Sequence, residues 1–310
     1  MLSIIIPAYN EEAMIMKTSN TINNILIDAD IDYELIFVDD GSKDNTWNRI
    51  KEVQKINPRV RGIHFSRNFG KESAMFAGMS YAKGDCCVII DCDLQHPPEK
   101  IVDMYRLWEQ GYEVVEAVKS SRGEESMLHT VCAKCFYSMI SKAIDIDMQH
   151  ASDFKLLDRK ALLVLLNMKE KHAFFRALSS WIGFKTTQIE FDVQERTEGE
   201  SKWSPWSLVK YALSNIAAFS TAPMQIVTVL GFLMFLSSLV LSVNSLYQKF
   251  AGIAVDGFTT VILLQLFTGS IMMISLGIIG YYISKIYEEV QDRPRWIVSE
   301  TCGEESETNF

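Results

Sequence analysis

Short apolar runs alternate with amphipathic stretches over the N-terminal part of the chain. The runs have the length of buried strands, and the stretches between them repeat their apolar positions at helical spacing. This alternation indicates βαβ units, and therefore an α/β fold with a mainly parallel sheet. The predicted strands are Ser3–Ile6, Tyr33–Val38, Val60–Phe65, Cys86–Ile90 and Glu113–Val118, and the predicted helices lie near Glu11–Ile27, Asn45–Ile56, Glu72–Ala82 and Pro98–Gln110.

The pattern changes after this region. It is helical from about Ser126 to Ile144, a new unit opens at Asp153–Asp158, and Phe184–Gln194 should add a strand at the other side of the sheet. We expect the α/β domain to span residues 1–202 and an amphipathic helix to follow over 203–222. That helix suits a membrane interface, with ordinary core packing as the alternative. Its apolar face carries Trp206, Val209, Leu213 and Ile216.

Two long segments of the second half contain no Asp, Glu, Lys or Arg. Their cores, about 224–246 and 258–284, are longer than the roughly 20 apolar residues that cross a bilayer. Two buried core helices are the alternative, but the length and the tyrosines near the segment ends favour membrane spans. Residues 223–284 are therefore predicted to form a two-helix transmembrane region in a multi-pass protein of the inner or plasma membrane.

The chain begins with a strand pattern instead of a signal peptide, so we expect the large domain to stay cytoplasmic. More basic residues flank the outer ends of the two apolar segments than lie between them, as the positive-inside rule requires. Residues 285–310 should form a cytoplasmic C-terminal tail, whose polar, Glu-rich end predicts disorder. The flanking basic residues are Lys202, Lys210, Lys285, Arg293 and Arg295, and the acidic residues of the tail are Glu300, Glu304, Glu305 and Glu307.

The net charge of −9 argues against nucleic acid as a partner. Six cysteines in a cytoplasmic protein are expected to be free thiols. Cys132 and Cys135 form a lone Cys-x-x-Cys pair within a helical pattern, which is a weak signal for zinc or redox chemistry. Composition thus argues against nucleic acid as a partner and against disulfide bonds, but it does not identify a reaction.

The strongest candidates for chemistry are two carboxylates, Asp91 and Asp93, which follow the apolar run Cys86–Ile90 directly. In extended backbone, residues two apart project to the same side, so both carboxylates can approach one cation. Ligands of α/β proteins bind at the carboxyl ends of the strands. A hard divalent cation there would complete its shell with phosphate oxygens. The pair alone is a common loop sequence, so it needs support from other segments.

Three further predicted strands also end in polar clusters. These clusters are Pro7–Glu11, Val38–Thr46 and Ser66–Lys71. Because parallel strands of such a sheet carry their ligand-binding loops at one edge, all four segments should meet there. Helix capping is the alternative for each acidic turn taken alone, and it explains the four together less well.

The order and spacing of these segments resemble glycosyltransferase family 2, whose catalytic domain has the Rossmann-like GT-A fold. The resemblance is carried by Pro-Ala-Tyr-Asn-Glu at 7–11, Asp-Asp-Gly-Ser at 39–42 and Asp-x-Asp at 91–93. It implies that Asp91 and Asp93 hold Mg²⁺ or Mn²⁺ against a sugar-nucleotide diphosphate, and that Asp93 takes part in catalysis. The donor-binding residues that it implies are Pro7, Tyr9, Glu11, Asp39, Asp40, Lys71 and Asp91.

Within that family the chain resembles the polyprenyl-phosphate glycosyltransferases. Asp91–Glu99, Ser152–Arg159 and Arg196–Trp203 match their segments, and the match extends over both apolar segments. The resemblance implies that Gln95 joins the metal ligands. It also implies that Asp153 is the catalytic aspartate, as a base or as an electrostatic and orienting group. The implied ligands of the acceptor phosphate are Arg122, Arg196, Ser201 and Lys202, and Lys155 stands where many relatives have Arg.

By this resemblance we expect inverting transfer of one sugar from a nucleotide sugar to a polyprenyl phosphate, such as undecaprenyl phosphate, for glycosylation of the cell envelope. UDP-glucose is the favoured donor, with UDP-N-acetylglucosamine and GDP-mannose as alternatives, and a homo-oligomer is also implied. A processive polysaccharide synthase is the runner-up, but Gln291–Trp296 has the wrong spacing for the motif of those enzymes. An inactive membrane adaptor is the alternative outside enzymes, and the intact acidic and basic positions argue against it.

Overall fold

The computed structural model describes residues 1–119, 152–168, 170, 174–191, 222–252 and 257–303. The chain divides into two compact units, Met1–Ser207 with Pro294–Phe310, and Leu208–Arg293. The helical pattern predicted over 126–144 lies outside the described residues. The amphipathic helix predicted over 203–222 also lies outside them, except for Ala222.

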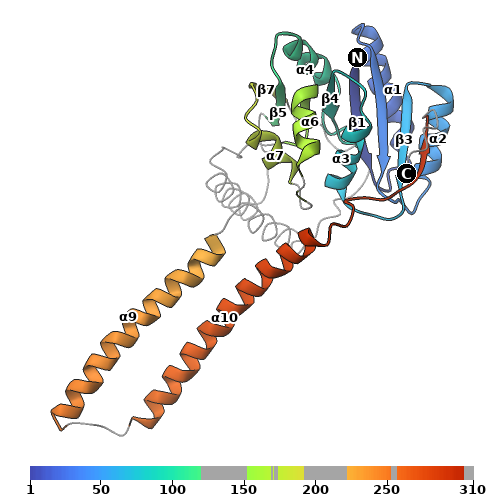
Figure 1. Ribbon diagram of the computed structural model, residues 1–310. Coiled ribbons are helices and arrows are strands. Elements are labelled where there is room, and N and C mark those ends of the chain that lie inside the picture. Colours follow the sequence, from blue (N-terminus) through green and yellow to red (C-terminus); the bar gives the residue numbers. More distant parts are fainter. Residues whose placement is uncertain (120–151, 169, 171–173, 192–221, 253–256, 304–310) are drawn as a thin grey trace. The chain divides into compact units, whose positions relative to one another are not determined.

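An eight-stranded sheet forms the centre of the first unit (Figure 1). Its strand order is β7-β5-β6-β4-β1-β2-β3-β8. β6 is antiparallel to both of its neighbours and β8 is antiparallel to β3, whereas the other pairs are parallel. The strands are β1 Leu2–Ala8, β2 Tyr33–Asp39, β3 Val60–Phe65, β4 Cys86–Ile89, β5 Val114–Lys119, β6 Lys155–Asp158, β7 Thr186–Phe191 and β8 Val298–Cys302.

Helices cover both faces of this sheet (Figure 1). α1, α2 and α4 contribute to one apolar cluster with alternate residues of β1. α3 packs on β1 and β2 from the other face, and α6 contacts both α3 and α7. The helices are α1 Ile15–Asp28, α2 Thr46–Ile56, α3 Lys71–Tyr81, α4 Lys100–Glu109, α6 Arg159–Asn167 and α7 Phe175–Trp181.

The sequence of the central strand β1 is apolar at nearly every position because helices cover both faces of the strand. All seven of its residues are buried. Leu2, Ile4 and Ile6 belong to the cluster with α1, α2 and α4, whereas Ile5 faces α3 at Gly78. A Cβ atom at Gly78 would lie 2.4 Å from Cγ2 of Ile5, so this glycine allows α3 to approach the sheet closely. A parallel strand covered on both faces is apolar throughout.

The five strands and four helices predicted for the first 120 residues are present, with ends that differ by only a few residues. The strand predicted near Phe184–Gln194 is β7, and it occupies the sheet edge opposite to β8. The α/β fold is therefore confirmed, but the sheet is mixed: among the described strands four neighbouring pairs are parallel and three are antiparallel. β6 and β8 are additional strands, and both run against the parallel direction.

The prediction that the acidic tail is disordered is wrong for its first part. Residues Val298–Cys302 form β8, which pairs with β3. Glu300 accepts hydrogen bonds from Nε1 of Trp47 at 2.7 Å and from Nζ of Lys51 at 3.3 Å. The segment has few apolar residues, so it is pairing with β3 and these contacts that make it a strand. Residues 304–310 lie outside the described part of the chain.

The second unit contains two long helices, α9 Ala222–Phe250 and α10 Phe258–Val290. Among the described residues, one helical segment, Phe267–Val290, is long and apolar enough to cross a membrane. The apolar stretch Val227–Leu241 of α9 is shorter. Two membrane spans are therefore not confirmed, and α10 extends beyond the end predicted for the second span.

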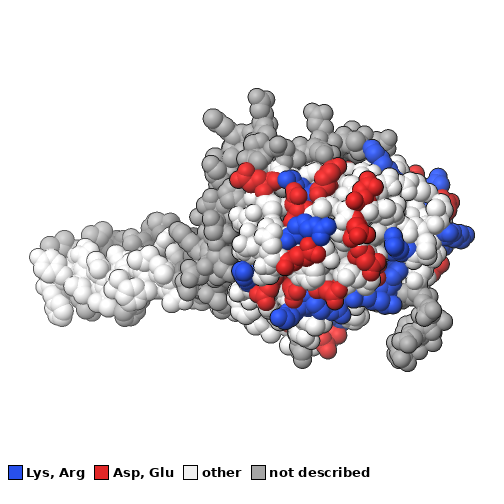
Figure 2. Space-filling view, turned by 90° about the horizontal axis from the view of Figure 1, so that it is seen from above, with Lys and Arg blue, Asp and Glu red and all other residues white. Residues whose placement is uncertain are grey.

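The charged surface is mixed in sign where Figure 2 shows it. Lys and Arg side chains lie among Asp and Glu side chains on that face of the described residues. Exposed pairs of the domain include Arg49–Glu52, Lys100–Asp103 and Arg106–Glu109, each three residues apart on a helix. Such pairs contribute little to stability. The charges that matter for chemistry lie elsewhere, in a partly buried cluster.

Candidate active site

The carboxyl ends of four parallel strands meet at one edge of the sheet. β4, β1, β2 and β3 are neighbours in this order, so the four polar segments lie together as predicted. The order reverses between β1 and β4, which is the switch point at which open α/β sheets bind ligands. Asp91 and Asp93 follow β4, and Tyr9–Glu11 follows β1, so these segments flank the switch point.

The segment after β4 places three oxygen-bearing side chains at alternate positions. Asp91, Asp93 and Gln95 are partly exposed, whereas the residues between them are buried. The N–H of Gln95 donates to Oδ1 of Asp93 at 3.1 Å, and Leu94 turns the backbone with a φ of 57°. The two-residue period expected for the carboxylates is therefore present and continues to Gln95.

These three residues fit an open site for a divalent cation. Carboxylate and amide oxygens are the donors that Mg²⁺ and Mn²⁺ prefer. Among the described residues, no group of three or more His, Cys, Asp or Glu side chains could hold a metal ion by itself. A cation held by Asp91, Asp93 and Gln95 would keep open coordination positions, which phosphate oxygens and water could fill.

One lysine joins Asp91 to the predicted catalytic aspartate. Nζ of Lys71 lies 2.6 Å from Oδ1 of Asp91 and 3.0 Å from Oδ2 of Asp153. Arg176 also binds Asp153, with Nε 2.8 Å from Oδ1 and one terminal nitrogen 2.9 Å from Oδ2. Two-pronged pairing of this kind fixes the orientation of a carboxylate. Four separate elements thus converge here: the loop after β4, the start of α3, the segment before β6, and α7.

The two cations keep Asp153 ionised. Burial alone would raise the pKa of Asp153, but the charges of Arg176 and Lys71 hold this pKa well below its usual value. Burial also opposes ionisation of Asp91, and yet Lys71 lowers the pKa of Asp91. The two carboxylates raise the pKa of Lys71 against its desolvation. The ion pairs hold the Asp153 carboxylate in one orientation, and a carboxylate whose pKa is lowered is a weaker base.

Glu72 is a further carboxyl group beside this cluster, in the first turn of α3. Burial, together with the charge of Asp153, raises the pKa of Glu72 to about 8. Its side chain accepts the N–H of Phe175 at 3.0 Å. Because Phe175 directly precedes Arg176, this hydrogen bond helps to place the guanidinium group that binds Asp153.

Asp39 and Asp40, at the end of β2, are buried and held by groups of the protein itself. Oδ2 of Asp39 lies 2.8 Å from Nδ1 of His64. Asp40 accepts the N–H of Phe69 at 2.6 Å and that of Gly70 at 2.9 Å. Burial raises the pKa of Asp40 to about 6, although the two backbone hydrogen bonds oppose this shift. Neither side chain caps a helix, so the capping alternative does not explain them.

The remaining predicted donor-binding residues lie at the end of β1. Pro7 is a buried residue of the strand, whereas Tyr9 and Glu11 are partly exposed after it. The N–H of Glu11 donates to Oγ1 of Thr46 at 2.8 Å, and a second hydrogen bond links the same two loops. The loop after β1 is thereby tied to the loop that begins with Asp40.

Two polar residues of the motifs are buried instead of facing the site. Lys155 has its Nζ 2.9 Å from Glu116, and both side chains are almost inaccessible, so it acts within the core and not as a phosphate ligand. His96 stacks on Phe154 with ring centroids 5.1 Å apart. Its Nδ1 is buried without a hydrogen-bond partner among the described residues and lies 4.0 Å from Asp91. His96 therefore packs the segment of Phe154 against the segment that contains Asp91.

No pattern in the sequence predicts the role of Arg176, because its spacing from Asp153 carries no helical or strand period. Only the packing of α7 brings its side chain to the carboxylate. The predicted acceptor-binding residues Arg122, Arg196, Ser201 and Lys202 lie outside the described residues.

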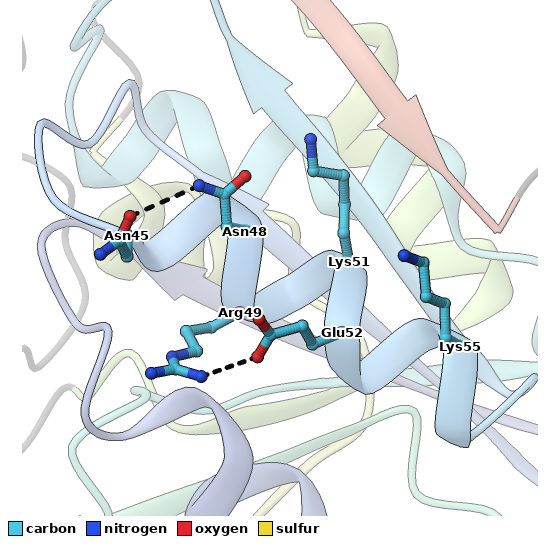
Figure 3. Close-up of a pocket in the computed structure, with 6 residues that line it drawn as sticks. All are labelled: Asn45, Asn48, Arg49, Lys51, Glu52 and Lys55. Carbon is cyan, nitrogen blue, oxygen red and sulfur yellow. Dashed lines mark hydrogen bonds and ion pairs between the residues drawn. The ribbon is translucent and has the colours of Figure 1, made fainter.

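A surface hollow of about 540 Å³ lies away from these residues, along α2 (Figure 3). Asn45, Asn48, Arg49, Lys51, Glu52 and Lys55 line it. Its side chains largely satisfy one another, since Asn48 donates to Asn45 and Arg49 pairs with Glu52. None of the residues predicted for the active site contributes to it, so it is not a candidate for the reaction.

The α/β fold and the acidic strand ends resemble those of glycosyltransferases, and comparison with known proteins shows the same class of protein. The model of glycosyl transferase family 2 matches residues 3–163. The chain belongs to this family, and it is a glycosyltransferase. The matched region includes Asp39, Asp40, Lys71, Asp91 and Asp153, so the family assignment rests on the segments that form the site.

Relatives are similar over nearly the whole chain. The uncharacterized glycosyltransferase YkcC of Bacillus subtilis (strain 168) is 40% identical over 306 residues, which are 98% of this chain and 95% of that protein. A prophage bactoprenol glucosyl transferase homolog of Escherichia coli (strain K12) is 34% identical over 305 residues, 96% and 98% of the two chains. The crystal structure of glucosyl-3-phosphoglycerate synthase from Mycobacterium tuberculosis with Mn²⁺, UDP and phosphoglyceric acid aligns at a TM-score of 0.49 and 18% identity, over 70% and 76% of the chains. That likeness is too distant to transfer ligands.

Proposed function

We propose that the protein transfers a single sugar from a nucleotide sugar to a polyprenyl phosphate at the cytoplasmic face of a membrane. The observation that carries this proposal is the link from Asp91 through Lys71 to Asp153. It connects the segment suited to a cation and a diphosphate with the aspartate predicted to act in transfer. The names of relatives such as the bactoprenol glucosyl transferase homolog support the lipid acceptor and favour glucose.

The chemistry explains why cations surround the proposed transfer site. Donor diphosphate and acceptor phosphate are both anions, and a phosphate monoester with a second pKa of about 6 is largely ionised at neutral pH. The nucleophile therefore needs little help from a base, and charge repulsion is the larger barrier. Lys71 and Arg176 bind Asp153 in an ionised state, in which it can orient groups or stabilise positive charge on the sugar.

A divalent cation, Mg²⁺ or Mn²⁺, would be held by Asp91, Asp93 and Gln95. When bound, it would neutralise charge on the leaving diphosphate. Pro7, Tyr9, Glu11, Asp39 and Asp40 would surround the nucleotide, the last two by shaping the loops that line it. Acceptor binding by Arg122, Arg196, Ser201 and Lys202 stays a prediction from the sequence.

The proposed membrane region rests on one helix and adds a second span and an interfacial helix to it. The apolar segment Phe267–Val290 supports a span in α10, and we propose a second span in α9 and an interfacial helix over 203–222. A domain of residues 1–202 would then work at the headgroup level, where the phosphate of a polyprenyl chain lies. The homo-oligomer implied by the resemblance also stays a prediction.

The test uses membranes that contain the full chain, undecaprenyl phosphate and a panel of radiolabelled sugar nucleotides. We expect label from UDP-glucose to enter the lipid phase, to be lost on chelation of divalent metal, and to be restored by Mg²⁺ or Mn²⁺. Labelling from UDP-N-acetylglucosamine or GDP-mannose instead would correct the donor. A long polymer would favour a processive synthase, and failure to label lipid with any donor would contradict the lipid acceptor.

A further inference from the structure

The segment that follows α10 in the chain returns to the sheet and lies along its edge. We call residues Arg295–Cys302 the C-terminal strap. Its strand, β8, pairs with β3 from Gly62 to Phe65, with an irregularity at His64 and Phe65. Gly62 allows this approach, because a Cβ atom there would lie 2.7 Å from Sγ of Cys302. The far end of the strap is thus fitted closely to β3.

The near end of the strap reaches the loop after β3. Trp296 stacks on Phe65 with ring centroids 6.4 Å apart and planes 13° from parallel. The carbonyl of Ile297 accepts the N–H of Ser66 at 3.0 Å. Phe65 in turn meets the ring of Phe69 edge-on at 5.7 Å. The strap therefore contacts the first residue of loop 66–70 directly and its fourth residue through Phe65.

The same loop is also held by the two residues that follow β2. Asp40 accepts the N–H groups of Phe69 and Gly70. Gly41 packs so tightly on the loop that a Cβ atom there would lie 2.4 Å from the carbonyl carbon of Arg67. The loop ends at Lys71, whose Nζ bridges Asp91 and Asp153. The conformation of the loop thus sets the position of the Lys71 backbone, from which the ammonium group reaches Asp91 and Asp153.

A second set of contacts leads from the strap to Arg176. The guanidinium of Arg295 lies over the ring of Phe76, 4.9 Å from its centroid. It also donates to the carbonyl of Met168. Phe76 meets Phe175 edge-on at 6.4 Å, and Phe175 directly precedes Arg176. Arg176 is therefore linked to the strap through Phe175 and Phe76, and Lys71 is linked to it through loop 66–70.

We propose that the C-terminal strap is a positioning element of the active site, and that Trp296 acts through loop 66–70 to place Lys71 against Asp91 and Asp153. Covering the edge of the sheet is the simpler role of a terminal strand. That role needs only β8, whereas Arg295 and Trp296 lie before the strand and contact side chains of α3 and of the end of β3. The catalytic consequence rests on the function proposed above, but the structural coupling does not.

The first arm of the test measures amide hydrogen exchange of the full chain in detergent. In Trp296→Ala the peptide covering residues 66–71 should exchange about tenfold faster than in the wild type. Loss of the aromatic contact lowers the free energy of local opening of the loop, so the open state is populated more often. A peptide from α4 should be unchanged. Trp296→Phe should restore slow exchange in large part.

The matched control is Glu300→Gln. Glu300 lies in the same strap, but its side chain contacts Trp47 and Lys51 and not loop 66–70. This variant should leave exchange at residues 66–71 within about twofold of the wild type, because an exposed pair contributes little. If Trp296→Ala yields no folded protein, Trp296→Leu replaces it with the same readouts.

The second arm separates positioning from loss of folded enzyme. Suppose that the loop adopts the conformation that binds the donor in a smaller fraction of the molecules. The apparent affinity for the donor then falls in proportion to that fraction, but the bound molecules still have the binding conformation. Trp296→Ala should therefore raise KM for the donor about fivefold and change kcat less than about twofold. A merely structural role would lower kcat with the amount of active protein and leave KM unchanged.

Unchanged exchange at residues 66–71 in a folded Trp296 variant would overturn the proposal, and so would an equal effect of Glu300→Gln. Faster exchange with an unchanged KM would reject the positioning of Lys71 for donor binding. The exchange arm needs no donor or acceptor. It therefore tests the coupling between the strap and loop 66–70 even if the wild type transfers no sugar to lipid. That failure would contradict only the proposed function.

Discussion

Two sets of carboxylates lie at the same edge of the sheet, but the protein binds them differently. Asp39 and Asp40, at the end of β2, are buried and held by His64 and by the backbone N–H groups of Ser42, Phe69 and Gly70. Asp91 and Asp153 are held instead by long cationic side chains, Lys71 and Arg176. The first set is fixed by backbone geometry, whereas the second is fixed by groups that can change rotamer.

This difference separates structural from exchangeable carboxylates. A carboxylate satisfied by backbone N–H groups cannot give them up without moving the loop that carries them. A carboxylate paired with a lysine whose side chain is 42% exposed can exchange that partner for a metal ion or a substrate group. If the proposed function is right, the pair at the end of β2 would shape the donor site and the Asp91–Asp153 group would take part in the reaction, and substitution tests this distinction.

The largest expected effect is on turnover at the exchangeable site. Asp153→Asn keeps the shape of the side chain but removes the charge that Lys71 and Arg176 bind. We expect transfer to fall by about 10²- to 10³-fold, the usual loss of one oriented electrostatic group. Affinity for the nucleotide should stay similar, because Asp153 is not among the groups predicted to bind it. Lipid labelling and nucleotide titration measure the two quantities.

The pH profile tells the two roles of Asp153 apart. If Asp153 were a general base, its protonation would abolish turnover, so turnover would fall as the pH is lowered through a pKa near neutral pH. Because Arg176 and Lys71 hold the pKa of Asp153 well below its usual value, we expect no such step from this residue above about pH 5. Full activity of Asp153→Asn would show that the assignment is wrong.

At the fixed site the main effect should be on stability. Asp40→Ala leaves the N–H groups of Phe69 and Gly70 without their acceptor. Each unsatisfied buried donor costs about 1–3 kcal/mol, so the thermal midpoint in detergent should fall clearly. Asp103→Ala is the control, because Asp103 is exposed and forms only a surface pair with Lys100. Equal midpoints for the two variants would contradict the structural role of Asp40.

The stability lost in Asp40→Ala should depend on pH, and the pKa of Asp40 gives the direction of this dependence. Burial raises the pKa of Asp40 from 3.8 to about 6, so the folded protein binds this proton more tightly than the unfolded chain. The resulting stability is present below about pH 4 and is lost as the pH rises to about 6. The gap between wild type and Asp40→Ala should therefore narrow over this window. The lowered pKa of Asp153 has the opposite sign, with stability lost as the pH falls.

The fold was predictable where the pattern reflects burial. The strands and helices before residue 120 come from apolar runs and amphipathic repeats, which are local signals. β8 was missed because Val298–Cys302 carries Ser299, Glu300 and Thr301 and has no buried face. Its partner, β3, lies more than two hundred residues earlier in the chain, and a single sequence holds no sign of that pairing.

The site was predictable only in part, for a related reason. Asp91, Asp93 and Gln95 could be grouped because they are two residues apart in one segment. Lys71 was named as a donor-binding residue, but its bridge between two carboxylates depends on three elements that meet in space. The contact of Arg176 with Asp153 and the buried pairing of Lys155 with Glu116 could not be predicted, because a motif gives a residue type without its burial. These side chains acquire their partners from packing.

The smallest effect we predict tests whether the partner of Asp91 can be exchanged. Lys71→Met removes the ammonium group 2.6 Å from Oδ1 of Asp91, which would compete with a divalent cation for that oxygen. In the absence of nucleotide, Mn²⁺ should bind about three- to tenfold more tightly to the variant, the size expected for one charge in a partly exposed site. Electron paramagnetic resonance of free Mn²⁺ measures this affinity without any turnover.

Arg176→Met is the matched control for this measurement, because it removes a cation that touches Asp153 and not Asp91. It should change Mn²⁺ affinity less than Lys71→Met does, since its charge lies farther from the ligand oxygens. Equal tightening in both variants would mean that only the net charge of the cluster matters. Weaker binding in Lys71→Met would show that this lysine supports the metal site, and the distinction between fixed and exchangeable carboxylates would then fail at Asp91.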